Sequence, residues 1–160
     1  MSEQIKNRLA AVVAAAVLTA GTAPAREVKV QHATGQFEVK ITPQAQDSSG
    51  GVDLARMAVA KVFSGGLAGT GQGDMLTGAG LVPGSAAYVL IERINGTLDD
   101  RAGSFALMHS ATLDRGKPDQ HIVIVPDSGS GGLTGISGSL TMRIEAGVHY
   151  YDLAYQLPPR

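Results

Sequence analysis

Two-residue alternation of apolar and polar side chains near the C-terminus restricts the fold more than any other feature of the sequence. The alternating apolar positions are Leu140, Met142, Ile144, Tyr151, Leu153, Tyr155 and Leu157. A turn signal, Ala146-Gly147, separates the two runs. Successive side chains of a β-strand point to opposite faces. The pattern therefore predicts two antiparallel strands that bury one face and wet the other.

The rest of the chain after Arg26 shows the same character. About eight short segments are separated by clusters of Gly, Pro, Asp and Ser, which is typical of an all-β sandwich or barrel. The predicted strands are 36–41, 54–64, 67–77, 85–98, 103–113, 120–126, 138–145 and 148–157. Glycines between 65 and 73 supply the kinks that closing a barrel requires. We therefore predict an all-β fold, a single closed antiparallel barrel of about eight strands.

Two polar stretches and two apolar runs complete this prediction. Residues 42–53 and 127–137 are expected to form the rims, and the glycine-rich part of the second, 128–132, is expected to be a flexible loop. Runs 88–91 and 122–125 are apolar on both faces. Another part of the protein should cover their outer side, and either a subunit contact or a packed loop would do so. This predicts a homo-oligomer.

Composition excludes several classes of function. The 160 residues carry a net charge of -1, 4% aromatic residues and no Trp. These values argue against nucleic-acid binding, which needs a basic surface or stacking aromatics. The absence of Cys removes thiolate metal sites and thiol nucleophiles. No two of the histidines have a metal-ligand spacing, so we expect no metal and no cofactor; the histidines are His32, His109, His121 and His149.

Residues 1–25 resemble a secretory signal. Lys6 and Arg8 form a basic region, 9–20 is apolar, and Ala23-Pro24-Ala25 offers small residues for cleavage. The apolar run is short for a membrane span, and an uncleaved N-terminal helix is the alternative. We expect cleavage after Ala25, a barrel domain over 26–160, periplasmic or secreted localisation, and no membrane insertion of the mature domain.

Several motifs together resemble one bacterial family. The runs are 85–93 (SAAYVLIER), 103–110 (GSFALMHS) and 125–129 (VPDSG), with His149-Tyr150-Tyr151 near the end. They are similar to the domain-of-unknown-function 3224 family over nearly the whole mature domain. The resemblance implies an eight-stranded barrel like that of allene oxide cyclase, frequent oligomerisation and no established activity.

Glu92 and His109 are the candidate catalytic residues. A two-residue turn at Asp100-Arg101 would place them directly opposite each other on adjacent strands, facing the interior. The Asn95-Gly96 dipeptide is a competing turn signal, but Asp99 to Gly103 has stronger turn character. A carboxylate beside an imidazole in an apolar interior suits general acid–base work. The alternative, which we favour, is a structural hydrogen-bonded pair that satisfies two buried polar groups.

The same interior face carries further candidates for ligand contact: Tyr88, Phe105, Leu107, His149, Tyr151 and Tyr155. Barrels of about eight strands either fill with side chains or hold one small ligand. The leading expectation is therefore a small apolar molecule bound inside the barrel. The alternatives are a cyclase or isomerase that uses the Glu-His pair, and a structural oligomer with a filled core.

Overall fold

A computed structural model of the chain describes residues 29–159. The expected signal segment, 1–25, lies outside the described residues. Within them the chain is almost entirely β-structure, with one short 3-10 turn, η1, and no α-helix. The elements are β1 (Gln31–Asp47), η1 (Ser49–Gly51), β2 (Asp53–Gly65), β3 (Leu67–Ala79), β4 (Ala86–Leu98), β5 (Arg101–Asp114), β6 (Lys117–Ile124), β7 (Ser130–Gly131), β8 (Ser137–Glu145) and β9 (Val148–Gln156).

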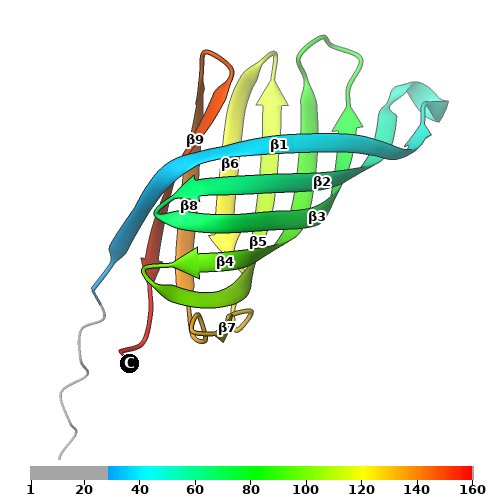
Figure 1. The fold of residues 1–160 in the computed structure, drawn as a ribbon. Coiled ribbons are helices and arrows are strands. Elements are labelled where there is room, and N and C mark those ends of the chain that lie inside the picture. Colours follow the sequence, from blue (N-terminus) through cyan, green and yellow to red (C-terminus); the bar gives the residue numbers. More distant parts are fainter. Residues whose placement is uncertain (1–28, 160) are drawn as a thin grey trace, which may run out of the picture.

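The long strands close into one barrel (Figure 1). Each pairs antiparallel with its neighbour in the order β1, β2, β3, β4, β5, β6, β8, β9, and β9 pairs again with β1. The two-residue β7 lies beside β5. Two contacts in this ring are short, since β6 meets β8 at the single pair Val123–Ser139 and β1 pairs with β9 only as far as Phe37–His149. The predicted all-β fold with a closed eight-stranded antiparallel barrel is confirmed.

The first predicted strand is too short, and the first predicted rim is wrong in part. β1 does not end at 41 but continues to Asp47, and it pairs with β2 as far as the Asp47–Leu54 pair, across a bulge between Pro43 and Ala45. Every side chain from Ile41 to Asp47 is exposed. A strand that is exposed to solvent on both faces needs no alternation of apolar and polar residues. Residues 42–47 therefore carry no two-residue pattern from which a strand could be predicted.

The second predicted rim, 127–137, does lie at one end of the barrel (Figure 1), but its glycine-rich part, 128–132, is paired and packed rather than a loose loop. The segment pairs with β5 through β7 and buries Leu133 and Ile136, which are 0% and 2% exposed. Arg101 fastens it, since the guanidinium donates to the carbonyls of Gly132 at 2.6 Å and Pro158 at 3.0 Å. The segment closes one end of the barrel.

The core occupies that closed half. It is a continuous apolar cluster whose fully buried members include Leu67, Ile94, Leu98, Phe105, Leu107, Leu133, Ile136, Tyr151 and Leu153. Toward the opposite end, where the turns between β3 and β4, β5 and β6, and β8 and β9 lie, several inward-facing side chains are only partly buried: Met57, Met75, Tyr88 and Met142. The barrel is thus packed in one half and open in the other.

Candidate functional site

The β4–β5 hairpin fixes the positions of Glu92 and His109. The chain turns at Asp99-Asp100, both with positive φ, between the paired Leu98 and Arg101. Short polar Asp side chains tolerate this left-handed conformation, which two-residue hairpins require. The turn thus lies within the predicted segment, Asp99 to Gly103. The competing turn signal, Asn95-Gly96, lies inside β4 and does not turn the chain.

The predicted register is wrong by two residues. Glu92 pairs with Leu107, and His109 pairs with Leu90. The turn begins at Asp99 rather than Asp100, and a turn one residue earlier shifts the pairing by two. A shift of two keeps both side chains on the same face. Glu92 and His109 are consequently diagonal neighbours inside the barrel, 0% and 2% exposed.

A third residue, Lys61 of β2, completes a buried cluster with this pair. The Oε1 atom of Glu92 accepts hydrogen bonds from Nζ of Lys61 and from Nε2 of His109, each at 2.7 Å. Lys61 is 7% exposed. Sequence reasoning missed it, although a signal exists: Lys61 is in phase with Val59 and Phe63 on the apolar face of its strand.

Glu92 is held as a carboxylate. Burial alone would raise its pKa, but the hydrogen bond from His109 and the charge and hydrogen bond of Lys61 outweigh burial and lower the pKa below its ordinary 4.5. Its Oε2 atom has no hydrogen-bond partner among the described residues. That atom lies beside Gly71. A Cβ atom at position 71 would come within 2.8 Å of Oε2, so a glycine there avoids a clash with the carboxylate.

His109 is held as a neutral ring. Burial lowers its pKa below the ordinary 6.5, and the repulsion from Lys61 acts in the same direction, while the hydrogen bond to Glu92 only partly opposes them. Since ionised Glu92 can only accept, Nε2 carries the ring proton and donates. The other ring nitrogen, Nδ1, is then an acceptor.

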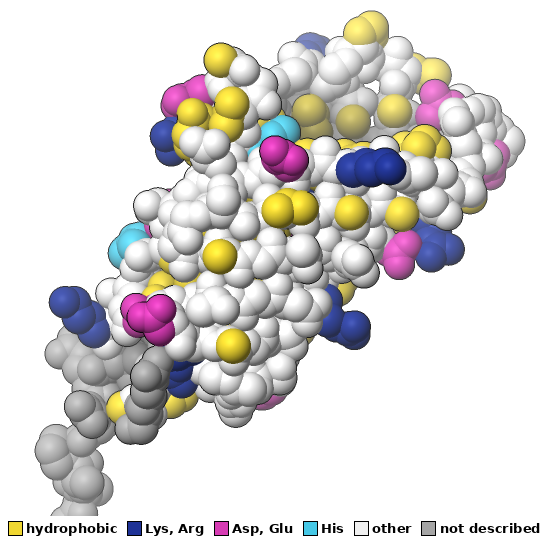
Figure 2. All heavy atoms as spheres, viewed as in Figure 1, with side chains coloured by type: hydrophobic (Ala, Val, Ile, Leu, Met, Phe, Trp, Pro, Cys, Tyr) yellow, Lys and Arg dark blue, Asp and Glu magenta, His cyan; other side chains and the backbone are white. Residues whose placement is uncertain are grey.

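A cavity of about 100 Å³ lies above this cluster in the open half of the barrel. Its charged and polar lining consists of Lys61, His109 and His149. The centroid of the His149 ring lies 4.9 Å from that of Phe37. The remaining lining is mainly apolar: Phe37, Val39, Ile41, Val59, Met75, Tyr88, Leu90 and Met142. Ile41 is 49% exposed, so the cavity reaches solvent. Figure 2 shows hydrophobic side chains around the hollow at this end, next to a histidine.

The structure divides the predicted ligand residues into two groups. Tyr88 and His149 line the cavity. Phe105, Leu107 and Tyr155 are at most 3% exposed in the closed half and do not line it. Burial raises the pKa of Tyr88 and of Tyr155, so both phenols stay protonated.

Tyr151 also lies in the closed half, where its hydroxyl holds the turn between β2 and β3. It accepts from the Leu67 amide at 2.9 Å and lies 3.1 Å from the carbonyls of Ser64 and Leu67. The hydroxyl therefore accepts one hydrogen bond and shares its single hydrogen between two carbonyls, which leaves it satisfied in the interior. The geometry makes Tyr151 a packing and turn-fixing residue.

No helix within 29–159 is long and apolar enough to cross a membrane. Over the same residues, no group of three or more His, Cys, Asp or Glu side chains is arranged to hold a metal ion.

Fold and interior together define a closed eight-stranded antiparallel barrel, packed at one end, with a Lys-Glu-His cluster beneath a cavity at the other. The family described as "Protein of unknown function (DUF3224)" matches residues 33–155, and the chain belongs to this family.

A solved structure supports the assignment. The crystal structure of a protein of unknown function from the DUF3224 family of Shewanella oneidensis MR-1 is 42% identical in sequence, with a TM-score of 0.78, and the match covers 82% of this chain and 100% of that one. No curated protein matches the chain. The family is thus established, and its activity is not.

The pKa directions at the cluster predict how stability depends on pH. Both folded pKa values lie below the ordinary ones, so as the pH falls the unfolded chain takes up these protons first. The stability contributed by neutral His109 is complete above pH 6.5 and is lost as the pH falls through its folded pKa; that of Glu92 is lost in the same way below 4.5.

Thermal melts across pH 4–8 should show the melting temperature falling on acidification. His109→Gln, which cannot titrate, should flatten the part of the curve just below pH 6.5. The matched control is His121→Gln, because His121 is exposed on the outside of β6. An unchanged slope in His109→Gln would contradict the assignment of a neutral buried ring.

Proposed function

We propose that this protein binds a small, largely apolar molecule in the open half of its barrel. One observation carries the proposal: the cavity is lined mainly by apolar side chains and has a few polar groups, among them Lys61 and His109. Binding sites for small molecules have this composition, an apolar wall with a few polar groups that fix orientation.

The dimensions of the cavity restrict the guest. Its volume of about 100 Å³ is below the several hundred Å³ of a drug-sized pocket. Val39 and Met142 are only partly buried at its wall, and Ile41 and Ile144 are about half exposed near the opening. The guest is therefore either small or a longer molecule of which one end enters while the rest leaves through the opening.

Blocking the cavity tests this function. Met142→Trp should fill the space and weaken binding of the neutral apolar dye 1-aminoanthracene at least about tenfold, an amount equal to about 1.4 kcal/mol. Dye fluorescence, excited above the tryptophan band, reports binding. The control is Val62→Trp, since Val62 is on the outer face of β2 and 56% exposed. If the dye binds Met142→Trp as tightly as it binds the unmodified protein, the cavity is not the site, and the alternative of a structural barrel with a filled core gains support.

A cyclase or isomerase activity is the second candidate. It is favoured by the neutral His109 at the cavity wall beside an ionised carboxylate, because an unprotonated imidazole can take a proton from a bound molecule. In this proposal Glu92 holds the ring tautomer and stabilises the imidazolium that forms, while the apolar walls confine the substrate.

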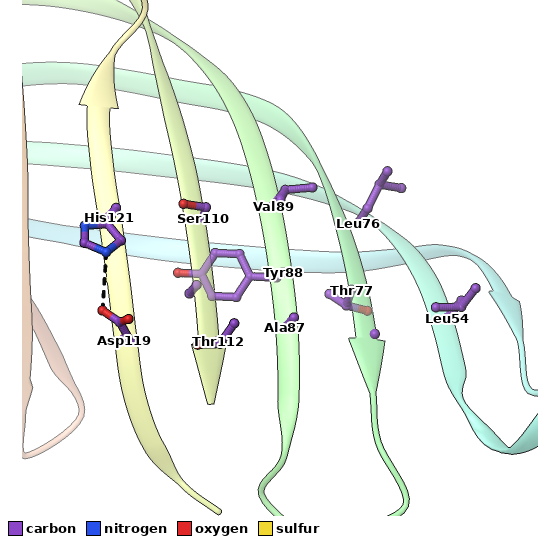
Figure 3. A pocket seen from close by; sticks show the side chains of 12 residues that line it. Leu54, Leu76, Thr77, Ala87, Tyr88, Val89, Ser110, Thr112, Asp119 and His121 are labelled. Atoms are coloured by element: carbon purple, nitrogen blue, oxygen red, sulfur yellow. Dashed lines mark ion pairs between the residues drawn. The ribbon is translucent and has the colours of Figure 1, made fainter. Parts of the chain in front are cut away.

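We also propose that the barrel self-associates through the outer face of β3 to β6. Leu76, Val89 and Ile91 are each more than 50% exposed there, and the pairs Leu76–Val89, Ile91–Met108 and Met108–Val123 join them into one apolar patch. Figure 3 shows Leu54, Leu76 and Val89 along the groove that this face forms. A continuous apolar patch of this kind is typical of an interface.

Light scattering at micromolar concentration should detect at least a dimer, and Ile91→Lys should reduce its mass to that of the monomer, because a charge would be buried without a partner. The control Ile144→Lys changes an equally exposed isoleucine outside the patch, 57% against 54%. A monomeric unmodified protein would contradict self-association through this face.

A further inference from the structure

Lys61 presents an ammonium group to the cavity with capacity to donate more hydrogen bonds. An ammonium carries three donors, and the Glu92 carboxylate takes one of them at 2.7 Å. Nζ also lies near the rings of Phe37 and Phe63, whose centroids are 5.0 and 6.0 Å away, and Glu92 is its one hydrogen-bond partner among the described residues. Aromatic faces stabilise the charge without accepting conventional hydrogen bonds. An oxygen acceptor that enters the cavity would meet the remaining donors.

The charges of the cluster decide which oxygen suits the cavity. Lys61 and ionised Glu92 cancel each other at 2.7 Å, and His109 is neutral. A carboxylate on the guest would bring a second negative charge close to the buried Glu92, with Lys61 as the one cation of the cluster. Buried charges without their own partner are costly. A carbonyl oxygen accepts from the ammonium and adds no charge.

We propose that Lys61 is the residue that recognises the ligand, and that the ligand is a neutral apolar molecule with a carbonyl oxygen, such as a ketone, aldehyde or ester. This inference rests on the proposed binding function and makes its ligand class specific. The carbonyl oxygen lies at Nζ of Lys61. The apolar body lies between Val39, Met142 and the ring of His149, which line the same cavity.

Three probes of nearly equal shape separate the possibilities: acetophenone carries a carbonyl, ethylbenzene has none, and benzoate carries a charge. Calorimetric titration of the unmodified protein should rank acetophenone about tenfold above ethylbenzene, as expected for one hydrogen bond from a charged donor. Benzoate should bind weakest.

A variant locates the preference. Lys61→Met keeps the side-chain length and removes the donor, so acetophenone should fall to the level of ethylbenzene, while ethylbenzene itself is unaffected. The control is Lys40→Met, because Lys40 lies exposed on the outer face of β1. The probe series in the unmodified protein gives an answer even where Lys61→Met folds poorly.

The outcomes distinguish this inference from the proposed function. If none of the three probes binds, the binding function itself is wrong. Equal affinity for acetophenone and ethylbenzene would leave the apolar site intact and overturn the role of Lys61. Tightest binding by benzoate would overturn the neutral-ligand class, and a preference for acetophenone that survives Lys61→Met would place its recognition elsewhere.

Discussion

Replacing Glu92 with alanine is expected to lower the free energy of unfolding by about 3–5 kcal/mol, the usual cost of removing one partner from a buried ion pair. The variant leaves Lys61 and His109 in the interior without the carboxylate oxygen that both now share at 2.7 Å. Lys61 would keep only aromatic neighbours for its charge. Denaturant unfolding monitored by circular dichroism measures the change.

The control for this prediction is Glu38→Ala, since Glu38 is exposed on β1 and its removal should change stability by less than about 0.5 kcal/mol. A double variant, Lys61→Met with Glu92→Met, removes both charges and should recover much of the lost stability, because apolar replacement of a whole buried pair is often neutral. If Glu92→Ala unfolds at the same denaturant concentration as the unmodified protein, the cluster is not a buried charge network.

Leu133→Ala is the second large effect, with an expected loss of about 2–5 kcal/mol. Leu133 is 0% exposed in the segment that closes the packed end of the barrel, in contact with the apolar cluster around it. Truncation would open a void between that segment and the strands, and a close-packed interior relaxes only partly around such a void. Thermal and denaturant unfolding both report the loss.

The exposed counterpart of Leu133 is Leu81, which is 84% exposed on the turn between β3 and β4. Leu81→Ala should leave stability within about 0.5 kcal/mol. Equal, small effects at both positions would mean that the glycine-rich segment is as mobile as its composition suggested and does not close the barrel.

The sequence was informative wherever one face of a strand is buried and the other wet. The alternating pattern correctly predicted the buried faces of β8 and β9. It also placed Glu92 and His109 on one face, because an error of two residues in the register leaves each side chain on the same side of the sheet. It was uninformative at β1 beyond Ile41, where both faces are wet and the strand continues through pairing with β2. Long-range pairing of that kind leaves no local pattern.

Two features of the site arise from contacts between distant parts of the chain. Lys61 contacts Glu92 because β3 lies between β2 and β4 in a fixed register. A lysine on the apolar face of a strand does not identify its partner, which here lies 31 residues away in the sequence. Leu133 and Ile136 are buried within a run of Gly, Ser and Thr whose composition is that of a mobile loop. Only the closed barrel end gives these two side chains a surface to pack against.

A crystal structure grown with acetophenone is the most direct test of the central claim, that the open half of the barrel is a binding site with Lys61 as its polar contact. Density for acetophenone is expected between Val39, Met142 and His149, with the carbonyl oxygen within hydrogen-bond distance of Nζ of Lys61. An empty cavity, with acetophenone only in the outer groove beside Leu76 and Val89 or nowhere on the protein, would contradict it.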